Sequence, residues 1–190
     1  MNSRLPPMRF HSPLLRLSAV SFLGVLLLAA SSAFAEDAKN IVKNGDFETG
    51  IEADWKIVGD SRMVTVESED GNKFVRIQPK DPAYCLILQR FPVGEDWSGL
   101  QVTARVRVRD LQKGPESHNT ATLLYVFEDS AGQHVGEWNQ LMIAKDQDWT
   151  EMVGDVKEIP AGATTLVVQC AMMNAAGAAD FDNVVVTPSK

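Results

Sequence analysis

The chain has 190 residues, of which 25 are acidic and 18 are Lys or Arg, so its formal net charge is −7. A chain of this charge lacks the basic footprint that nucleic-acid binding needs, because it repels the phosphate backbone. The composition therefore argues against a nucleic-acid partner and leaves carboxylates available for a hard cation such as calcium.

The N-terminal segment has the order of a secretory signal peptide. Three arginines precede an apolar run at residues 17–30, and Ala33-Phe34-Ala35 supplies small residues before a cleavage site. An uncleaved membrane anchor is the alternative, but this run of roughly 14 residues is shorter than the ~20 that span a bilayer. We expect residues 1–35 to be a signal peptide, residues 36–190 to be a single domain without a transmembrane segment, and the protein to be secreted or periplasmic.

The mature domain is more acidic than the whole chain. Three arginines leave with the leader, so 15 basic residues face 25 acids and the net charge becomes −10. Two cysteines remain, Cys85 and Cys170. In an oxidising compartment this even count allows one disulfide, and the alternative is two separate buried thiols.

After the leader, short β-rich runs alternate with turn residues, and no segment has the pattern of an amphipathic helix. In chain order, strands are expected near residues 64–66, 74–78, 84–91, 101–109, 120–128, 134–143, 149–156, 164–172 and 181–187. The run at 120–128 (TATLLYVFE) is apolar on both faces. Many short strands at this spacing predict an all-β sandwich.

The run at 101–109 has the clearest pattern. Apolar residues at even positions alternate with Thr103, Arg105, Arg107 and Arg109, which is the period of a half-buried strand. The arginine stripe could bind an acidic polysaccharide. In a chain this acidic, we favour the alternative that it is a solvated face whose charges pair with acids on a neighbouring strand.

The two ends of the domain and three short motifs between them carry a family resemblance. Residues 40–50 read NIVKNGDFETG and residues 177–188 read GAADFDNVVVTP. Between them lie Asp70-Gly71 before FVRIQ, then Leu88-Gln89, then Asp148-Trp149-Thr150 ahead of Ile159-Pro160. In this order they resemble the CenC-like carbohydrate-binding modules of the galactose-binding-domain-like superfamily. The resemblance implies a jelly-roll β-sandwich of two antiparallel sheets, but a fold alone does not fix function.

The resemblance also implies a structural calcium ion that ties the N-terminal segment to the last strand. Glu48 and Asp182 match the carboxylate ligands, Asp46 matches a carbonyl ligand, and residues 69–73 lie where further ligands come from. The alternative is that Asp46 and Glu48 cap a turn while Asp182 binds backbone amides. The same fold would place Cys85 and Cys170 in one sheet, so we predict a disulfide between them.

Sugar recognition requires an aromatic ring beside planar polar groups. Candidate rings are Trp138, Tyr84, Trp97 and Tyr125, with Gln89, Arg90, Glu137, Asn139 and Gln140 nearby. Trp138 is the strongest of them because residues 137–140 combine a ring with three polar groups, although core or edge packing is the alternative for each. Trp55 and Trp149 occupy positions that this family buries.

Catalysis has little support in the sequence. His118 and His134 have no Ser, Cys or Asp companion in a known catalytic arrangement, although a carboxylate pair of the glycosidase type remains open. We expect a non-catalytic, exported module that binds a poly- or oligosaccharide. The alternative is a structural or protein-interaction module of the same fold, with a protein partner in the periplasm or cell envelope.

Overall fold

The computed structural model describes residues 39–190, so the predicted signal peptide and its cleavage site lie outside the described residues. Within that range the chain forms β-strands and one 3₁₀ turn. No helix among these residues is long and apolar enough to cross a membrane. The elements are β1 (Lys56–Val58), η1 (Ser61–Met63), β2 (Val64–Glu69), β3 (Asn72–Ile77), β4 (Ala83–Pro92), β5 (Gly99–Gln112), β6 (Ala121–Glu128), β7 (His134–Ile143), β8 (Gln147–Val156) and β9 (Thr165–Ser189).

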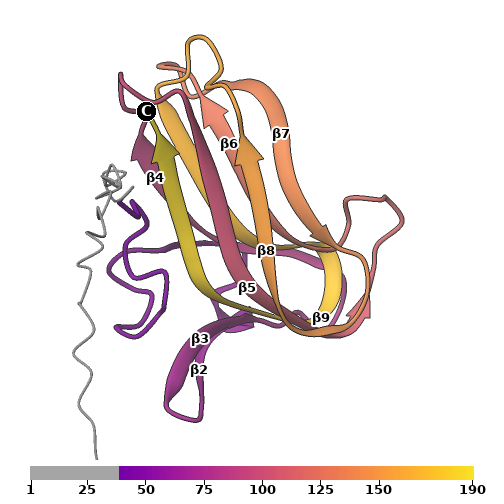
Figure 1. Cartoon of the computed structure of the whole chain (residues 1–190). Coiled ribbons are helices and arrows are strands. Elements are labelled where there is room, and N and C mark those ends of the chain that lie inside the picture. Colours follow the sequence, from indigo (N-terminus) through magenta and orange to yellow (C-terminus); the bar gives the residue numbers. More distant parts are fainter. Residues whose placement is uncertain (1–38) are drawn as a thin grey trace, which may run out of the picture. The chain divides into compact units, whose positions relative to one another are not determined.

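The strands form two antiparallel sheets that share β9 (Figure 1). We call the sheet with the order β1-β4-β9-β6-β7 sheet A and the sheet with the order β2-β3-β9-β5-β8 sheet B. Figure 1 shows β5 and β8 in one layer and β4, β6 and β7 in the other. The predicted all-β sandwich of two antiparallel sheets is confirmed.

Strand β9 passes from one sheet to the other near its middle. Residues 165–175 pair with β4 and β6 in sheet A, while residues 176–189 pair with β5 in sheet B. The crossing uses left-handed backbone at Asn174 (φ 46) and Gly177 (φ 111). A Cβ at Gly177 would lie 2.5 Å from the carbonyl oxygen of Asp110, so only glycine fits where β9 meets β5.

The core lies between the sheets. On β5 the alternating residues Val102, Ala104, Val106 and Val108 are all buried in it, as the period-two pattern predicts. Trp55, expected in the core, is 4% exposed and its ring lies 5.4 Å from that of Phe47. Both rings belong to the core, so the segment before β1 is packed against it.

The predicted disulfide is wrong in this structure, which holds Cys85 and Cys170 as two free, buried thiols. The two residues do lie on neighbouring strands, as expected. Cys85 is paired with Met172, however, and Cys170 with Ile87, so the two cysteines are diagonal neighbours. Diagonal partners lie ~7–8 Å apart, whereas a disulfide needs Cβ atoms within ~4.5 Å.

Candidate ligand-binding face

The outer face of sheet A carries an apolar band. Leu124 and Val126 on β6 and Val167 on β9 form a buried cluster separate from the main core, with Leu88 on β4 packed against it. These side chains point away from the core because their neighbours Leu123, Tyr125 and Phe127 point into it. Sequence reasoning did not single out this band. The signal was the run at 120–128, which is apolar on both faces and so predicts that both faces are covered.

Trp138 stands on this outer face at the edge of the sheet, on β7. The pairing of β6 with β7 shifts register between Tyr125 and Phe127, opposite the turn at Gly136 (φ 77). Such a bulge re-aims the side chains of the bulged strand. It lets the Trp138 ring stack on that of His134, with centroids 4.1 Å apart and planes 7° from parallel. Trp138 remains 62% exposed, so a large ring surface is open to solvent.

Tyr84 marks the opposite corner of the same face. It lies on β4, is 50% exposed and is paired with Met173 on β9. On β7, Trp138 precedes Asn139. Asn139 is level with Val168 on β9, because both are paired with Tyr125 on β6. Three strand spacings and five or six residues therefore separate the two rings. With ~4.8 Å between strands and ~3.3 Å per residue, they lie about 20–25 Å apart.

Polar side chains surround the apolar band. Arg90 on β4 and Glu128 on β6 form an ion pair across β9, and Gln140 is exposed next to Trp138 on β7. Gln169 on β9 is half-buried between Leu88 and Leu124. The face thus combines two open rings with hydrogen-bonding groups, around an apolar band whose Leu124, Val126 and Val167 are themselves buried.

Two predicted residues beside Trp138 support the bulge. The carbonyl oxygen of Glu137 accepts a hydrogen bond from Asn139 Nδ2 at 3.2 Å and lies 3.4 Å from His134 Nε2. Asn139 is paired with Tyr125, which points into the core, so its amide shapes the loop rather than the outer face. The Glu137 side chain is exposed.

Three other candidates lie away from this face. Gln89 is 6% exposed, and its amide binds both backbone groups of Lys43, at 3.2 and 2.7 Å, which fastens the N-terminal segment. Tyr125, considered as a possible sugar ring, is 4% exposed and fills the space beside Gly154. Trp97 is half-buried in the loop before β5.

The predicted calcium ligands gather in part around the start of β3. Asp182, which is fully buried, accepts at Oδ2 from Asn72 Nδ2 at 3.1 Å, and the same amide donates to the Lys73 carbonyl oxygen at 3.2 Å. Glu48 Oε1 accepts from the Lys73 backbone N–H at 2.8 Å. The Asn72 amide therefore lies between the Asp182 carboxylate and the Lys73 carbonyl oxygen, and rotating it would present Asn72 Oδ1 there instead.

The donor set fits a hard cation only loosely. Lys73 Nζ donates to the Glu48 carbonyl oxygen at 2.7 Å, and Arg105 Nη1 lies 3.9 Å from Asp182 Oδ2. Asp46 Oδ1 accepts from the Glu48 N–H at 3.4 Å, which is a turn-capping contact. Among residues 39–190, no three acidic, His or Cys side chains cluster as metal ligands. The carboxylates of Glu48 and Asp182, the Lys73 carbonyl oxygen and the Asn72 amide oxygen would make a weak calcium site.

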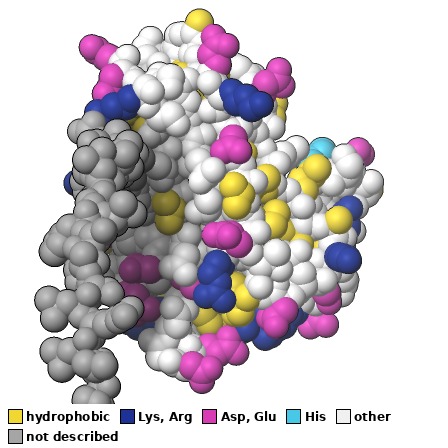
Figure 2. All heavy atoms as spheres, in the orientation of Figure 1, with side chains coloured by type: hydrophobic (Ala, Val, Ile, Leu, Met, Phe, Trp, Pro, Cys, Tyr) yellow, Lys and Arg dark blue, Asp and Glu magenta, His cyan; other side chains and the backbone are white. Residues whose placement is uncertain are grey.

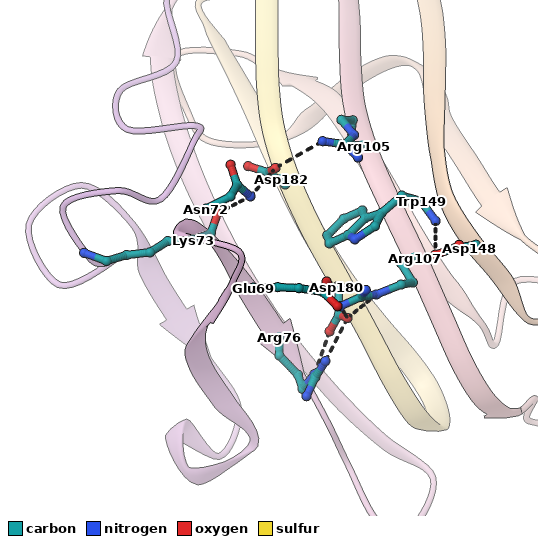
Figure 3. A network of polar contacts seen from close by, with 10 residues as sticks. All are labelled: Glu69, Asn72, Lys73, Arg76, Arg105, Arg107, Asp148, Trp149, Asp180 and Asp182. Carbon is teal, nitrogen blue, oxygen red and sulfur yellow. Dashed lines mark hydrogen bonds and ion pairs between the residues drawn. The ribbon is translucent and has the colours of Figure 1, made fainter.

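On the outer face of sheet B, Arg105 and Arg107 of the arginine stripe pair with acids on β9 and β2 (Figure 3). Arg107 Nη2 lies 2.8 Å from Asp180 Oδ2 and its Nη1 lies 2.6 Å from Glu69 Oε2, while Arg76 binds the other side of Asp180 at 2.6 Å. Both pairing with acids and solvation were expected of this stripe; the pairing is confirmed for Arg107, but its predicted solvation is wrong, because Arg107 is only 3% exposed. The hydrogen bond from Arg107 lowers the pKa of Glu69.

Trp149 covers this network, and its predicted place in the core is wrong. The ring is half-buried and lies 4.6 Å from the Arg107 guanidinium and 5.3 Å from the Phe74 ring, on the outer side of sheet B. The register of β5 and β8 shifts between Val106 and Val108, next to Trp149. On this side of the molecule, small hydrophobic patches lie among acidic and basic side chains (Figure 2).

Comparison with solved structures identifies the fold. The enzymatically active domain of bacteriophage CBA120 tailspike protein 4 matches with a TM-score of 0.60 and 18% identity over 79% of this chain, which spans 21% of that one. TmCBM61, solved with β-1,4-galactotriose, matches with a TM-score of 0.56 and 14% identity over 80% of this chain and 99% of that one. A CBM4 module matches with a TM-score of 0.55 and 12% identity over 78% of this chain and 99% of that one.

The chain has the β-sandwich fold of carbohydrate-binding modules. At these identities the likeness concerns fold alone. The sequence itself matches no family model and no curated protein.

Proposed function

We propose that this protein is a non-catalytic module that binds a poly- or oligosaccharide on the outer face of sheet A. The observation that carries the proposal is the pair of open rings, Trp138 and Tyr84, at opposite corners of one face with an apolar band between them. Sugar hydroxyls exchange water for protein hydrogen bonds at small net gain. Affinity for a neutral sugar must then come largely from ring contact and shape, and Trp138 and Tyr84 offer the ring contact.

The separation of the rings favours an extended chain over a single sugar. A ligand that touches both Trp138 and Tyr84 must span about 20–25 Å of sheet. Gln169, Gln140 and the Arg90–Glu128 pair lie along the way and can hydrogen-bond to hydroxyl groups. The fold shared with carbohydrate-binding modules supports a binding role without catalysis. The order of residues 1–35 supports export, so we place the ligand outside the cytoplasm.

The test is titration of the protein with soluble β-glucan, xylan and galactan. Binding is measured by the quenching of Trp emission and by calorimetry. Trp138→Ala should weaken binding about tenfold or more, because burying a large ring contributes ~1.5–3 kcal/mol. Trp138→Phe should retain part of the affinity. Val153→Ala removes an exposed apolar side chain from sheet B and is the matched control, expected to leave binding unchanged.

The proposal fails if no glycan binds, or if Trp138→Ala and Tyr84→Ala bind as the unaltered protein does. In that case the protein-interaction module becomes the better reading of the same exposed rings, because Trp and Tyr are also the residues enriched at protein interfaces.

A further inference from the structure

A second concave site lies at one end of sheet B, away from the apolar band. It is a cleft of about 820 Å³ where β5 begins and β8 and β9 end, next to the segment that leads into the domain. Its size falls in the range of small-molecule sites, ~300–1,000 Å³. Gly99 lies in its wall, where a Cβ would stand 2.3 Å from the Val156 carbonyl oxygen. Only glycine therefore lets β5 approach β8 so closely there.

The cleft is richer in positive charge than the rest of the molecule. Its lining includes three lysines, Lys39, Lys157 and Lys190, and one acid, Asp155, which accepts a hydrogen bond from Gln101 at 3.0 Å. Lys190 Nζ also lies 3.1 Å from the Asp96 carboxylate. Because Asp96 balances the charge of Lys190, it is Lys39 and Lys157 that favour an anionic ligand at this cleft, in a domain with an excess of acids.

The same cleft offers a ring and small polar groups. Trp97 forms part of the wall and packs against the core on its buried side. Gly94 lies under the indole, since a Cβ there would stand 2.4 Å from Trp97 Nε1. Ser98 and Thr187 add hydroxyl groups. A ring, hydroxyl groups and ammonium groups together match the apolar face, hydroxyls and charge of an acidic sugar.

We propose that this cleft is a second binding site, for a sugar that carries a carboxylate. It differs from the face of sheet A in position and in charge, and it does not depend on that face being a glycan site. An exposed carboxylate would pair with Lys157 and Lys39, while the sugar ring rests against Trp97.

The test uses untagged, ¹⁵N-labelled protein, because both Lys39 and Lys190 line the cleft. Tri-galacturonate should shift the backbone amides of Ser98, Gly99 and Lys157 and the Trp97 indole N–H, whereas neutral galactotriose should not shift them at equal concentration. The double variant Lys39→Gln/Lys157→Gln should weaken tri-galacturonate roughly five- to tenfold, as expected for two partly exposed ion pairs. Raising NaCl should weaken it as well.

Two controls make the outcome decisive. Lys113→Gln removes an exposed lysine beyond the other end of β5 and should leave binding unchanged. In Trp138→Ala, which removes a ring from the face of sheet A, tri-galacturonate should still shift the cleft resonances. The proposal is overturned if tri-galacturonate shifts no cleft resonance in the unaltered protein, if the double variant binds it normally, or if Trp138→Ala abolishes the cleft shifts. Equal shifts from inorganic phosphate alone would overturn the assignment to a sugar.

Discussion

Replacing Arg107 by alanine should destabilise the domain far more than replacing its neighbour Arg105. Arg107 is 3% exposed, bridges Asp180 and Glu69, and lies against the Trp149 ring. Removing one partner of a buried ion pair costs ~3–5 kcal/mol, because it leaves a buried charge uncompensated. Asp180 keeps its contact with Arg76, which reduces the cost to about 2–4 kcal/mol. For a domain of this size that corresponds to a fall in Tm of about 4–16 °C.

Arg105→Ala is the matched control. The Arg105 side chain is 45% exposed and lies 3.9 Å from Asp182, so its loss should cost no more than ~1 kcal/mol. Urea unfolding followed by Trp fluorescence measures both, with unchanged m-values showing that the native and unfolded states remain comparable. If the two variants have equal midpoints, the buried network does not stabilise the fold as we argue.

Three further predictions concern pH, calcium and thiols. Arg107 holds the pKa of Glu69 below its ordinary 4.5, so the stability from this contact is present above about pH 4.5 and is lost as the pH falls further. Glu69→Gln should flatten this part of the curve of stability against pH. An unchanged curve would contradict the pairing. If the oxygens around Asp182 bind calcium with a Kd of ~0.1–1 mM, 10 mM calcium should add about 1.4–2.7 kcal/mol to the free energy of unfolding. Asp182→Ala should remove this gain. Identical melting curves with calcium and with chelator would rule out the site. Burial raises the pKa of Cys85 and Cys170, so both thiols should resist thiol reagents in the native protein. Thiol titration of the denatured, unreduced protein should detect two reactive thiols per chain. Detecting no reactive thiol would indicate a disulfide.

The strands could be predicted where one face is buried and the other is polar. The alternation around Val102 to Val108 gave both the strand and its inward face, and nearly every observed strand overlaps a predicted run. The three-residue β1 was missed because so short a segment has no period. The continuity of β9 was missed because Ala175, Ala176 and Gly177 resemble a loop, although their small size is what lets the strand cross between sheets.

The site depends on features that local pattern does not contain. Trp138 was singled out for its polar neighbours, yet its exposure depends on the bulge in β7. Gln89 was expected near a ligand but binds a backbone segment 46 residues away. The predicted disulfide is wrong because Cys85 and Cys170 are offset by two residues in the pairing of β4 with β9. Composition does not determine this register.

The sharing of β9 has a consequence for how the chain folds during synthesis. The 25-residue strand β9 lies at the centre of both sheets, so neither sheet has its middle strand until residues 165–189 have emerged from the ribosome. Contacts this distant in sequence form slowly, because the long intervening loop must close first. The nascent chain should therefore stay open and sensitive to protease until β9 has emerged from the ribosome, and a nonsense mutation ahead of Thr165 should leave no folded fragment.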